Sequence, residues 1–324
     1  MRVLIIGGAG MVGQKLATHL AKDANWAAQI NEMILYDVVP AKTVKASFEI
    51  KTLTGSLANQ IESIKLASLK PDLVFHLAAI VSGEAETDFD KGWDINARGS
   101  WYLLEALRTE HQTSEGQYVP KLIFTSSIAV FGPPFPDKIT DNFLCAPMTS
   151  YGAQKAMTEL LISDYSRKGM IDGLSVRLPT ICVRPGMPNL AASSFFSGII
   201  REPLSGKEAI LPVPDTVRHW HASPRSAAGF LAHAAAIDLS KLGGRRAMNL
   251  PGVSCTVAEQ IEALRSIAGE DVVKLIKPKQ DQAIMDIVKN WPRDFAPEMA
   301  LSLGFTAEKN FEEIIQVYLD DDLP

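Results

Sequence analysis

Short apolar runs alternate along the first half of the chain with longer stretches whose apolar residues recur at helical spacing. The short runs predict strands at Val3–Ile6, Met33–Tyr36, Phe48–Leu53, Leu73–His76, Leu122–Thr125 and Leu174–Arg177. The longer stretches predict helices over residues 11–22, 58–69, 86–109 and 151–168. Strands that are covered by helices on both faces read as nearly continuous apolar runs. The alternation therefore predicts an α/β fold with a doubly wound parallel sheet.

The pattern changes after residue 178, where prolines gather in "LPTICVRPGMPNL" and "LPVPDTVRHWHASPRS". We interpret residues 1–180 as the sheet domain. Residues 215–245 contain a further helical pattern and are expected to return to that domain. Residues 181–214 and 246–324 are then expected to form a smaller C-terminal α+β cap.

Composition and charge narrow the class of protein. The chain has 324 residues, of which 47% are hydrophobic and 21% charged, and this is typical of a soluble globular protein. A net charge of -5 gives no electrostatic basis for binding nucleic acid. The apolar stretch 227–237 is far shorter than the ~20 residues of a membrane span. Three scattered cysteines, Cys145, Cys182 and Cys255, indicate a reducing compartment without disulfides or a metal site. We therefore expect a cytoplasmic protein with neither a nucleic-acid nor a membrane partner.

The first predicted strand runs directly into "GGAGMVG", where Gly7, Gly10 and Gly13 have the spacing G-x-x-G-x-x-G. A tight turn needs residues without Cβ, and the following helix offers unpaired N–H groups to a pyrophosphate. Asp37 ends the second strand, where a carboxylate can bind ribose hydroxyls and repel a 2′-phosphate. The pattern predicts a Rossmann-type domain that binds NAD rather than NADP. The alternative is a purely structural turn with Asp37 on the surface.

Polar and small residues follow two later strands at the carboxyl edge of the predicted sheet. The fourth strand ends in "FHLAA", where Ala78 and Ala79 would let a cofactor lie against the backbone. His76 is expected to pack beside that cofactor rather than to act as a ligand. The fifth strand ends in "TSS", which brings Ser126 and Ser127 to the edge where such sheets bind ligands.

The pentapeptide "YGAQK" places Tyr151 and Lys155 four residues apart, so on a helix they share one face. An unperturbed tyrosine has a pKa of about 10 and is a poor base at neutral pH. A nearby lysine cation favours the phenolate, which can then take the proton of a substrate alcohol as hydride leaves the same carbon. A serine hydroxyl can hold that oxygen. The alternative is an exposed tyrosine and a solvated lysine at a helix start.

In order, "GGAGMVG", Asp37, "HLAA", "NARGS", "TSSIAVFG" and "YGAQK" resemble the extended short-chain dehydrogenase/reductase family, which includes sugar-nucleotide epimerases and dehydratases. The resemblance implies that Ser127, Tyr151 and Lys155 are catalytic and that the protein is a homodimer formed through helices at about 93–109 and 151–168. Asn96 would have either a structural or a direct role. The implied NAD-binding residues are Gly7, Gly10, Met11, Val12, Gly13, Asp37, Ser56, Leu57, Leu77, Ala78, Ala79, Asn96, Tyr151, Lys155, Leu178 and Thr180.

Departures from the family pattern restrict the reaction. Ile128 and Ala129 stand where the family's 4,6-dehydratases carry an Asp-Glu pair, and Thr180 replaces the asparagine usual in epimerases. Ser56 replaces an aspartate that often contacts adenine. The resemblance then implies oxidation of the C2 hydroxyl of a small, four-carbon sugar acid to a 2-oxo acid. Alternatives are a uronate or L-threonine type of dehydrogenase, a sugar-nucleotide 4-epimerase, and a non-catalytic dinucleotide sensor.

Arginines of the cap are candidates for binding the acid group of the substrate. A guanidinium matches a carboxylate bidentately, so we expect Arg184 or Arg218 to hold it, although each could equally form a surface ion pair. Ser82, Ser127 and Tyr151 complete the predicted substrate site. His219 and His221 lie two residues apart without a third ligand nearby, so no metal site is predicted.

Overall fold

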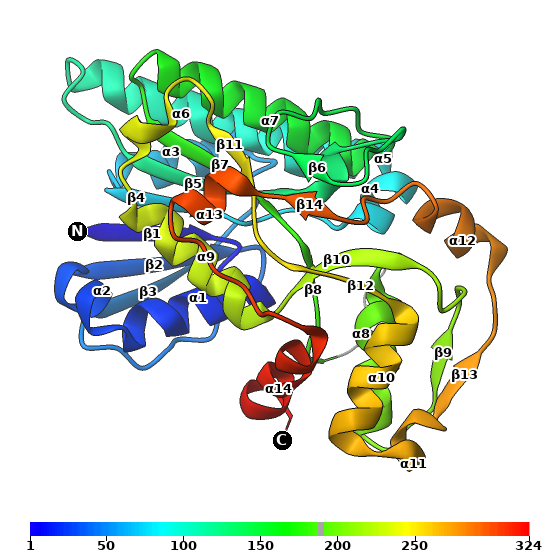
Figure 1. The fold of residues 1–324 in the computed structure, drawn as a ribbon. Helices are drawn as coiled ribbons and strands as arrows, with labels where there is room; N and C mark the ends of the chain where they lie inside the picture. The colour runs from blue at the N-terminus through cyan, green and yellow to red at the C-terminus, as the bar shows by residue number, and fades with distance from the viewer. Residues whose placement is uncertain (187–190, 324) are drawn as a thin grey trace.

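The computed structural model describes residues 1–186 and 191–323, and its centre is a seven-stranded parallel sheet in the order β11-β7-β5-β4-β1-β2-β3 (Figure 1). The strands are β1 (Arg2–Ile6), β2 (Glu32–Asp37), β3 (Glu49–Thr54), β4 (Leu73–His76), β5 (Lys121–Ser127), β7 (Asp172–Leu178) and β11 (Ala247–Asn249). The chain order reverses between β1 and β4, and sheets of this kind bind ligands at the carboxyl ends beside the reversal. The predicted doubly wound α/β fold is confirmed.

Alternate side chains of β1 enter two separate cores. Val3 and Ile5 pack in the core that α1 and α9 share, whereas Leu4 and Ile6 pack with α3, α6 and α7 on the other face. The alternation follows from the two-residue period of a strand, and it explains why the whole run is apolar. The helices of the two layers are α1 (Met11–Lys22), α9 (Pro224–Ala236), α3 (Gln60–Ser68), α6 (Gly99–Thr113) and α7 (Ser150–Arg167).

The helix predicted over residues 86–109 is divided into four segments. They are α4 (Ser82–Thr87), α5 (Phe89–Gly92), a π-helical segment (Trp93–Arg98) and α6. Asp88 causes the first break, because its side chain accepts a hydrogen bond from Lys91 N at 3.1 Å and caps α5. π-Helical segments occur frequently at functional sites.

A second, smaller body has its own core, formed by helices far apart in the sequence (Figure 1). Its helices are α8 (Ser194–Leu204), α10 (Val257–Ala268), α11 (Glu270–Val273), α12 (Gln282–Val288) and α14 (Phe311–Asp321). Its strands are β8 (Thr180–Ile181), β10 (Arg218–Ala222) and β12 (Val253–Thr256) in one sheet, and β9 (Ala209–Leu211) with β13 (Ile276–Pro278) in another. Within residues 1–186 and 191–323, no helix is long and apolar enough to cross a membrane.

Part of the range 246–324, which the sequence assigns to the cap, lies with the sheet domain instead. Ala247–Asn249 is the edge strand β11, and Ala300 of α13 (Glu298–Ser302) and Phe305 belong to the core of α1 and α9. β14 (Phe295–Ala296) pairs with β6 (Ile139–Thr140). These segments are too short to show a periodic pattern in the sequence. The remaining short elements are α2 (Ala24–Gln29) and 3₁₀ helices at Ile128–Val130 and Leu239–Leu242.

Candidate active site

The glycine turn after β1 has a separate physical reason for each of its three motif glycines. Gly7 has φ +92°, and a Cβ there would lie 2.7 Å from Ala78 N. A Cβ on Gly13 would collide with the carbonyl oxygen of Gly7. A Cβ on Gly10 would meet nothing closer than 3.4 Å, so the space beside it stays open. Gly7 and Gly13 are therefore required by the turn itself, and Gly10 leaves room for a ligand.

The N-terminus of α1 opens onto that space. Gly10 caps the helix without a side-chain hydrogen bond, and the first N–H groups of a helix have no partner inside it. Met11 and Val12 line the adjoining cavity. Asp37 reaches the turn from β2, and its carboxylate accepts hydrogen bonds from Ala9 N at 2.9 Å and Val38 N at 2.7 Å. These groups fit a dinucleotide, with N–H groups toward the pyrophosphate and a carboxylate toward the ribose.

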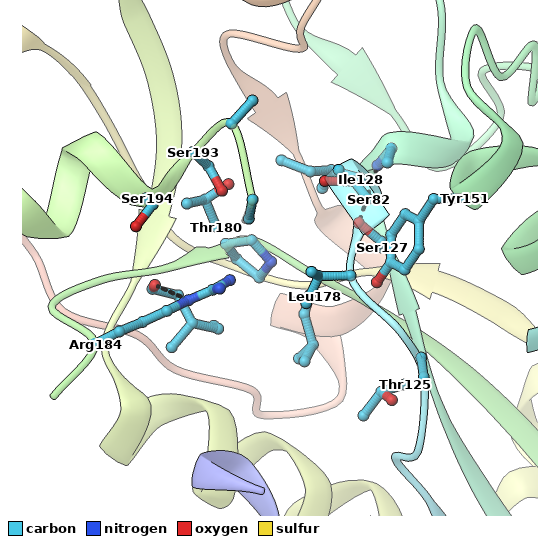
Figure 2. A pocket seen from close by; sticks show the side chains of 18 of the residues that line it. Ser82, Thr125, Ser127, Ile128, Tyr151, Leu178, Thr180, Arg184, Ser193 and Ser194 are labelled. Carbon is cyan, nitrogen blue, oxygen red and sulfur yellow. Dashed lines mark hydrogen bonds between the residues drawn. The ribbon is translucent and has the colours of Figure 1, made fainter. Parts of the chain in front are cut away.

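A cavity of about 490 Å³ extends from the glycine turn to the cap. Figure 2 shows Ser82, Ser127 and Tyr151 on one side of it and Thr180, Arg184, Ser193 and Ser194 on the other, with Leu178 between. The sheet domain supplies the first group and the cap region supplies most of the second. Predicted residues on the cavity wall are Gly7, Gly10, Met11, Val12, Gly13, Leu77, Ala79, Ser82, Ser127, Tyr151, Lys155, Leu178, Thr180 and Arg184.

Tyr151 stands in the first turn of α7, close to the end of β5. Thr149 caps this helix by accepting a hydrogen bond from Gly152 N at 3.1 Å. A Cβ on Gly152 would collide with the Ala129 carbonyl, so the glycine lets α7 approach the segment after β5 closely. Burial raises the pKa of Tyr151, and the charge of Arg184 and a hydrogen bond with Ser127 oppose that rise. Arg184 and Ser127 therefore both favour the phenolate of Tyr151.

Lys155 is buried one turn further along α7. Its ammonium donates a hydrogen bond to Thr125 O at 2.7 Å and lies 4.5 Å from the centre of the Phe124 ring and 5.6 Å from that of Tyr151. Burial lowers the pKa of Lys155 to about 7, against the charge of Glu159. The sequence predicts that Lys155 is the cation acting on Tyr151. The positive charge of Arg184 also favours the phenolate, and the role of Lys155 stays a prediction.

A buried polar cluster lies behind Lys155. Glu159 forms a two-point ion pair with Arg177, with Nε–Oε1 at 2.9 Å and Nη2–Oε2 at 2.7 Å, and it also accepts a hydrogen bond from Ser126. Arg177 Nη1 reaches Asn249 Oδ1 at 3.3 Å. Ser126 is thereby fixed by α7, which leaves Ser127 as the serine beside Tyr151.

The burial of Lys155 predicts a specific pH dependence of stability. In the folded protein its pKa of about 7 lies below the ordinary lysine value of 10.5, so between these values the unfolded chain binds more protons and folding becomes more favourable as pH rises. We expect the melting temperature of the cofactor-free protein, relative to that of Lys155→Met, to increase from about pH 7 toward pH 10. Thermal melts of both proteins at several pH values test this. Parallel curves would show that the lysine is not desolvated.

Asn96 connects the sheet edge to the catalytic helix. Its side chain lies in the π-helical segment and accepts a hydrogen bond from Ile80 N at 2.9 Å. It donates to Ile80 O at 3.2 Å and to Gln154 Oε1 at 2.8 Å. Asn96 thus holds the loop after β4 against α7. Together with Asp37, Ser56, Leu57 and Ala78 it stands outside the cavity wall proper.

The two candidate arginines occupy different places. Arg184 lies on the cavity wall, with Nε donating to Ile181 O at 3.1 Å, and no carboxylate of the described residues pairs with it. Arg218 is on the outside of the cap, where it pairs with Glu259 at 3.2 Å and donates to Ser254 O at 3.0 Å. The structure therefore brings Arg184, but not Arg218, to Tyr151.

Several wall residues have no counterpart among the sequence predictions. His219, Trp291 and Arg201 line the cavity from the cap, and Ser193 and Ser194 line it at the start of α8. The stretch "VRHWHASPR" could have pointed to His219, but on sequence grounds this histidine is considered only as a candidate metal ligand. Among the residues that the structure describes, no three His, Cys, Asp or Glu side chains gather as a metal site would require.

A family model for the NAD dependent epimerase/dehydratase family matches residues 3–223. The chain belongs to this family. The membership confirms the resemblance to extended short-chain dehydrogenases, and NAD is the cofactor that the glycine turn and Asp37 are suited to bind. Two curated relatives are named D-erythronate dehydrogenase. That of Cupriavidus necator is 43% identical over 99% of this chain and 98% of its own, and that of Haemophilus influenzae is 40% identical over 100% of both.

Solved structures agree with the fold. A structure described as a nucleoside-diphosphate-sugar epimerase from Agrobacterium tumefaciens has a TM-score of 0.95 and 53% identity, and the match covers 99% of this chain and 94% of that one. L-threonine 3-dehydrogenase from Trypanosoma brucei has a TM-score of 0.84 at 24% identity, covering 100% and 98%. The second likeness is one of fold alone.

Proposed function

We propose that the protein is an NAD-dependent dehydrogenase that oxidises the C2 hydroxyl of a small sugar acid, D-erythronate above all, to the 2-oxo acid. The observation that carries the proposal is the placement of Arg184 opposite Tyr151 and Ser127 in one cavity. Arg184 and Tyr151 are close enough that each changes the pKa of the other. We expect one acid to place its carboxylate on Arg184 and its hydroxyl on Tyr151. Two full-length relatives named for this reaction support the choice of acid.

The residues divide the work as follows. Arg184 binds the carboxylate, and its position turns the C2 hydroxyl toward Ser127 and Tyr151. Ser127 holds the hydroxyl oxygen while Tyr151, as the phenolate, takes its proton. Bound NAD supplies the acceptor for the C2 hydride. Gly10, Met11 and Val12 leave open the site that holds its pyrophosphate, and Lys155 holds the nicotinamide ribose.

A substrate screen tests the proposal. We expect D-erythronate to reduce NAD in amounts that far exceed the enzyme, whereas uronates and L-threonine react at least tenfold more slowly in kcat/KM, a difference of about 1.4 kcal/mol in transition-state binding. Formation of NADH is followed by its absorbance. Faster oxidation of a uronate would move the substrate to that class while leaving the dehydrogenase chemistry in place.

The second candidate is a nucleotide-sugar epimerase, which the description of the Agrobacterium structure favours. An epimerase returns its hydride to the substrate and so accumulates no free NADH. Thr180 argues against this reaction, because it stands at the position where the family's epimerases usually carry an asparagine. Incubation with a UDP-hexose distinguishes the two reactions, because we expect neither NADH nor an epimerised sugar.

We also propose that the protein is a cytoplasmic homodimer that pairs through α6 and α7. Trp101 on α6 and Met157 and Leu160 on α7 are exposed apolar side chains, and Leu160 is 72% accessible. Burying them against a second copy would remove this apolar surface from water. Cys145, Cys182 and Cys255 are all free, which suits a reducing compartment. A solution mass of twice 35.3 kDa is expected from light scattering.

A further inference from the structure

His219 presents a fixed hydrogen-bond acceptor on the cap side of the cavity. Its side chain is only 3% exposed, and it stacks on the Phe196 ring with centroids 5.2 Å apart and planes 3° apart. His221 meets its edge from one side and Trp291 packs against it at 5.1 Å. The imidazole therefore has little freedom to rotate.

The hydrogen bonds of His219 determine its tautomer. Nδ1 lies 2.9 Å from Pro292 O, and because a carbonyl oxygen can only accept, Nδ1 carries the proton. Burial lowers the pKa of His219 to about 4, so the ring is neutral at physiological pH and Nε2 is a bare acceptor. Thr180 Oγ1 lies 2.7 Å from Nε2 and must donate to it.

This arrangement also determines whether the Thr180 hydroxyl can donate or accept a further hydrogen bond. Its only hydroxyl proton is directed to His219, so the lone pairs of Oγ1 are left to accept. Thr180 is on the cavity wall, across from Tyr151 and next to Arg184 (Figure 2). A ligand at this point must therefore offer a donor. The sequence assigns Thr180 to the cofactor, whereas its fixed polarity and its place beside Arg184 suit the substrate.

We propose that the Thr180–His219 pair is a specificity site that accepts a hydrogen bond from a second hydroxyl of the acid, at C3 or C4. The inference rests on the proposed function, because it takes the carboxylate on Arg184 and the C2 hydroxyl on Tyr151 as the other two contacts. Three polar contacts along one short carbon chain select a polyhydroxy acid. An acid with hydrogen in place of that hydroxyl leaves the Thr180 acceptor unpaired, and this disfavours it.

The test compares substrates that differ by one hydroxyl. Kinetics are measured with D-erythronate and with its 3-deoxy and 4-deoxy analogues, for the wild type, Thr180→Val and Thr180→Ser. We expect one analogue to be oxidised by the wild type with kcat/KM lowered by about tenfold or more. Thr180→Val should lose a similar factor on D-erythronate, mainly through KM, and almost nothing on that analogue. Thr180→Ser retains the hydroxyl and should keep most of the discrimination.

His219 is a positioning residue in this scheme, so its variants need their own readout. His219→Phe releases the Thr180 proton and should reduce discrimination between D-erythronate and the analogue, with no further loss when Thr180→Val is added. His219→Gln, whose amide oxygen can accept from Thr180, should restore part of it. Circular dichroism melts show whether each variant folds.

The possible outcomes separate this inference from the proposed function. If the wild type does not oxidise D-erythronate, the proposed function is wrong, and the same comparison is made with the acid that it does oxidise and the deoxy forms of that acid. If Thr180→Val raises KM for NAD and leaves the ratio between acid and analogue unchanged, the threonine binds nicotinamide instead and the inference is overturned. Equal losses on D-erythronate and both analogues overturn it as well.

Discussion

Replacing Tyr151 with phenylalanine is expected to lower kcat for D-erythronate by about 10³-fold, because the variant has no oxygen to take the C2 proton. The side chain keeps its shape, and the neighbouring Gly152 and Thr149 still fix the start of α7. Dissociation constants for NAD should therefore stay within about twofold of the wild-type value, since phenylalanine preserves the packing of the ring. Steady-state kinetics and calorimetric titration with NAD measure the two quantities separately.

A second tyrosine on the same helix provides the control. Tyr165 hydrogen-bonds Glu105, away from the cavity, so Tyr165→Phe should retain wild-type turnover even if it melts at a lower temperature. The wild-type rate of oxidation should rise with pH as Tyr151 loses its proton, and the small residual rate of Tyr151→Phe should not. Near-wild-type turnover in Tyr151→Phe, or an unchanged pH profile, would exclude Tyr151 as the base.

The sheet domain could be predicted from sequence because its information is local. Each buried parallel strand is a continuous apolar run, and the glycine turn joins β1 to α1 within a few residues. β11 could not be found in this way, since three residues show no period. Its place in the sheet follows from its pairing with β7, from Ala247↔Ser175 to Asn249↔Arg177, and β7 lies about 70 residues earlier in the chain. The strands of the cap are equally hard to predict from sequence, because they are short and pair with segments far along the chain.

The residues of the site also differ in whether a local motif predicts them. Tyr151, Lys155 and Ser127 follow local motifs, and the structure brings them to one cavity wall or its edge. Arg184 follows β8, whereas Arg218 begins β10, and whether Arg218 reaches the cavity depends on which face of that strand it occupies, since a strand alternates its faces at every residue. Arg218 points out to Glu259, while His219 points in to Phe196. The stretch "VRHWHASPR" contains no motif that predicts which of its residues face the cavity.

Removing Arg184 tests the opposite side of the cavity. We expect Arg184→Met to raise KM for D-erythronate by about 10- to 100-fold, the effect of losing a hydrogen bond to a charged group worth about 1.5–3 kcal/mol. Arg184→Lys keeps the charge but loses the bidentate geometry, so its KM should be intermediate. Arg218→Met is the matched control, because Arg218 lies outside the cavity and its loss should leave KM unchanged.

Arg184→Met should also change the pKa of Tyr151, the proposed base. Arg184 opposes the rise in the pKa of Tyr151 that burial causes, so removing its charge should raise that pKa further. Oxidation needs the phenolate, and the rising limb of the pH–rate profile should therefore move to higher pH in Arg184→Met and stay in place in Arg184→Lys. A carboxylate clamp alone would raise KM without moving the limb. An Arg184 that served only the fold would lower the melting temperature and leave both KM and the limb unchanged. A raised KM together with a displaced limb would show that one guanidinium both selects the acid and prepares the tyrosine to oxidise it.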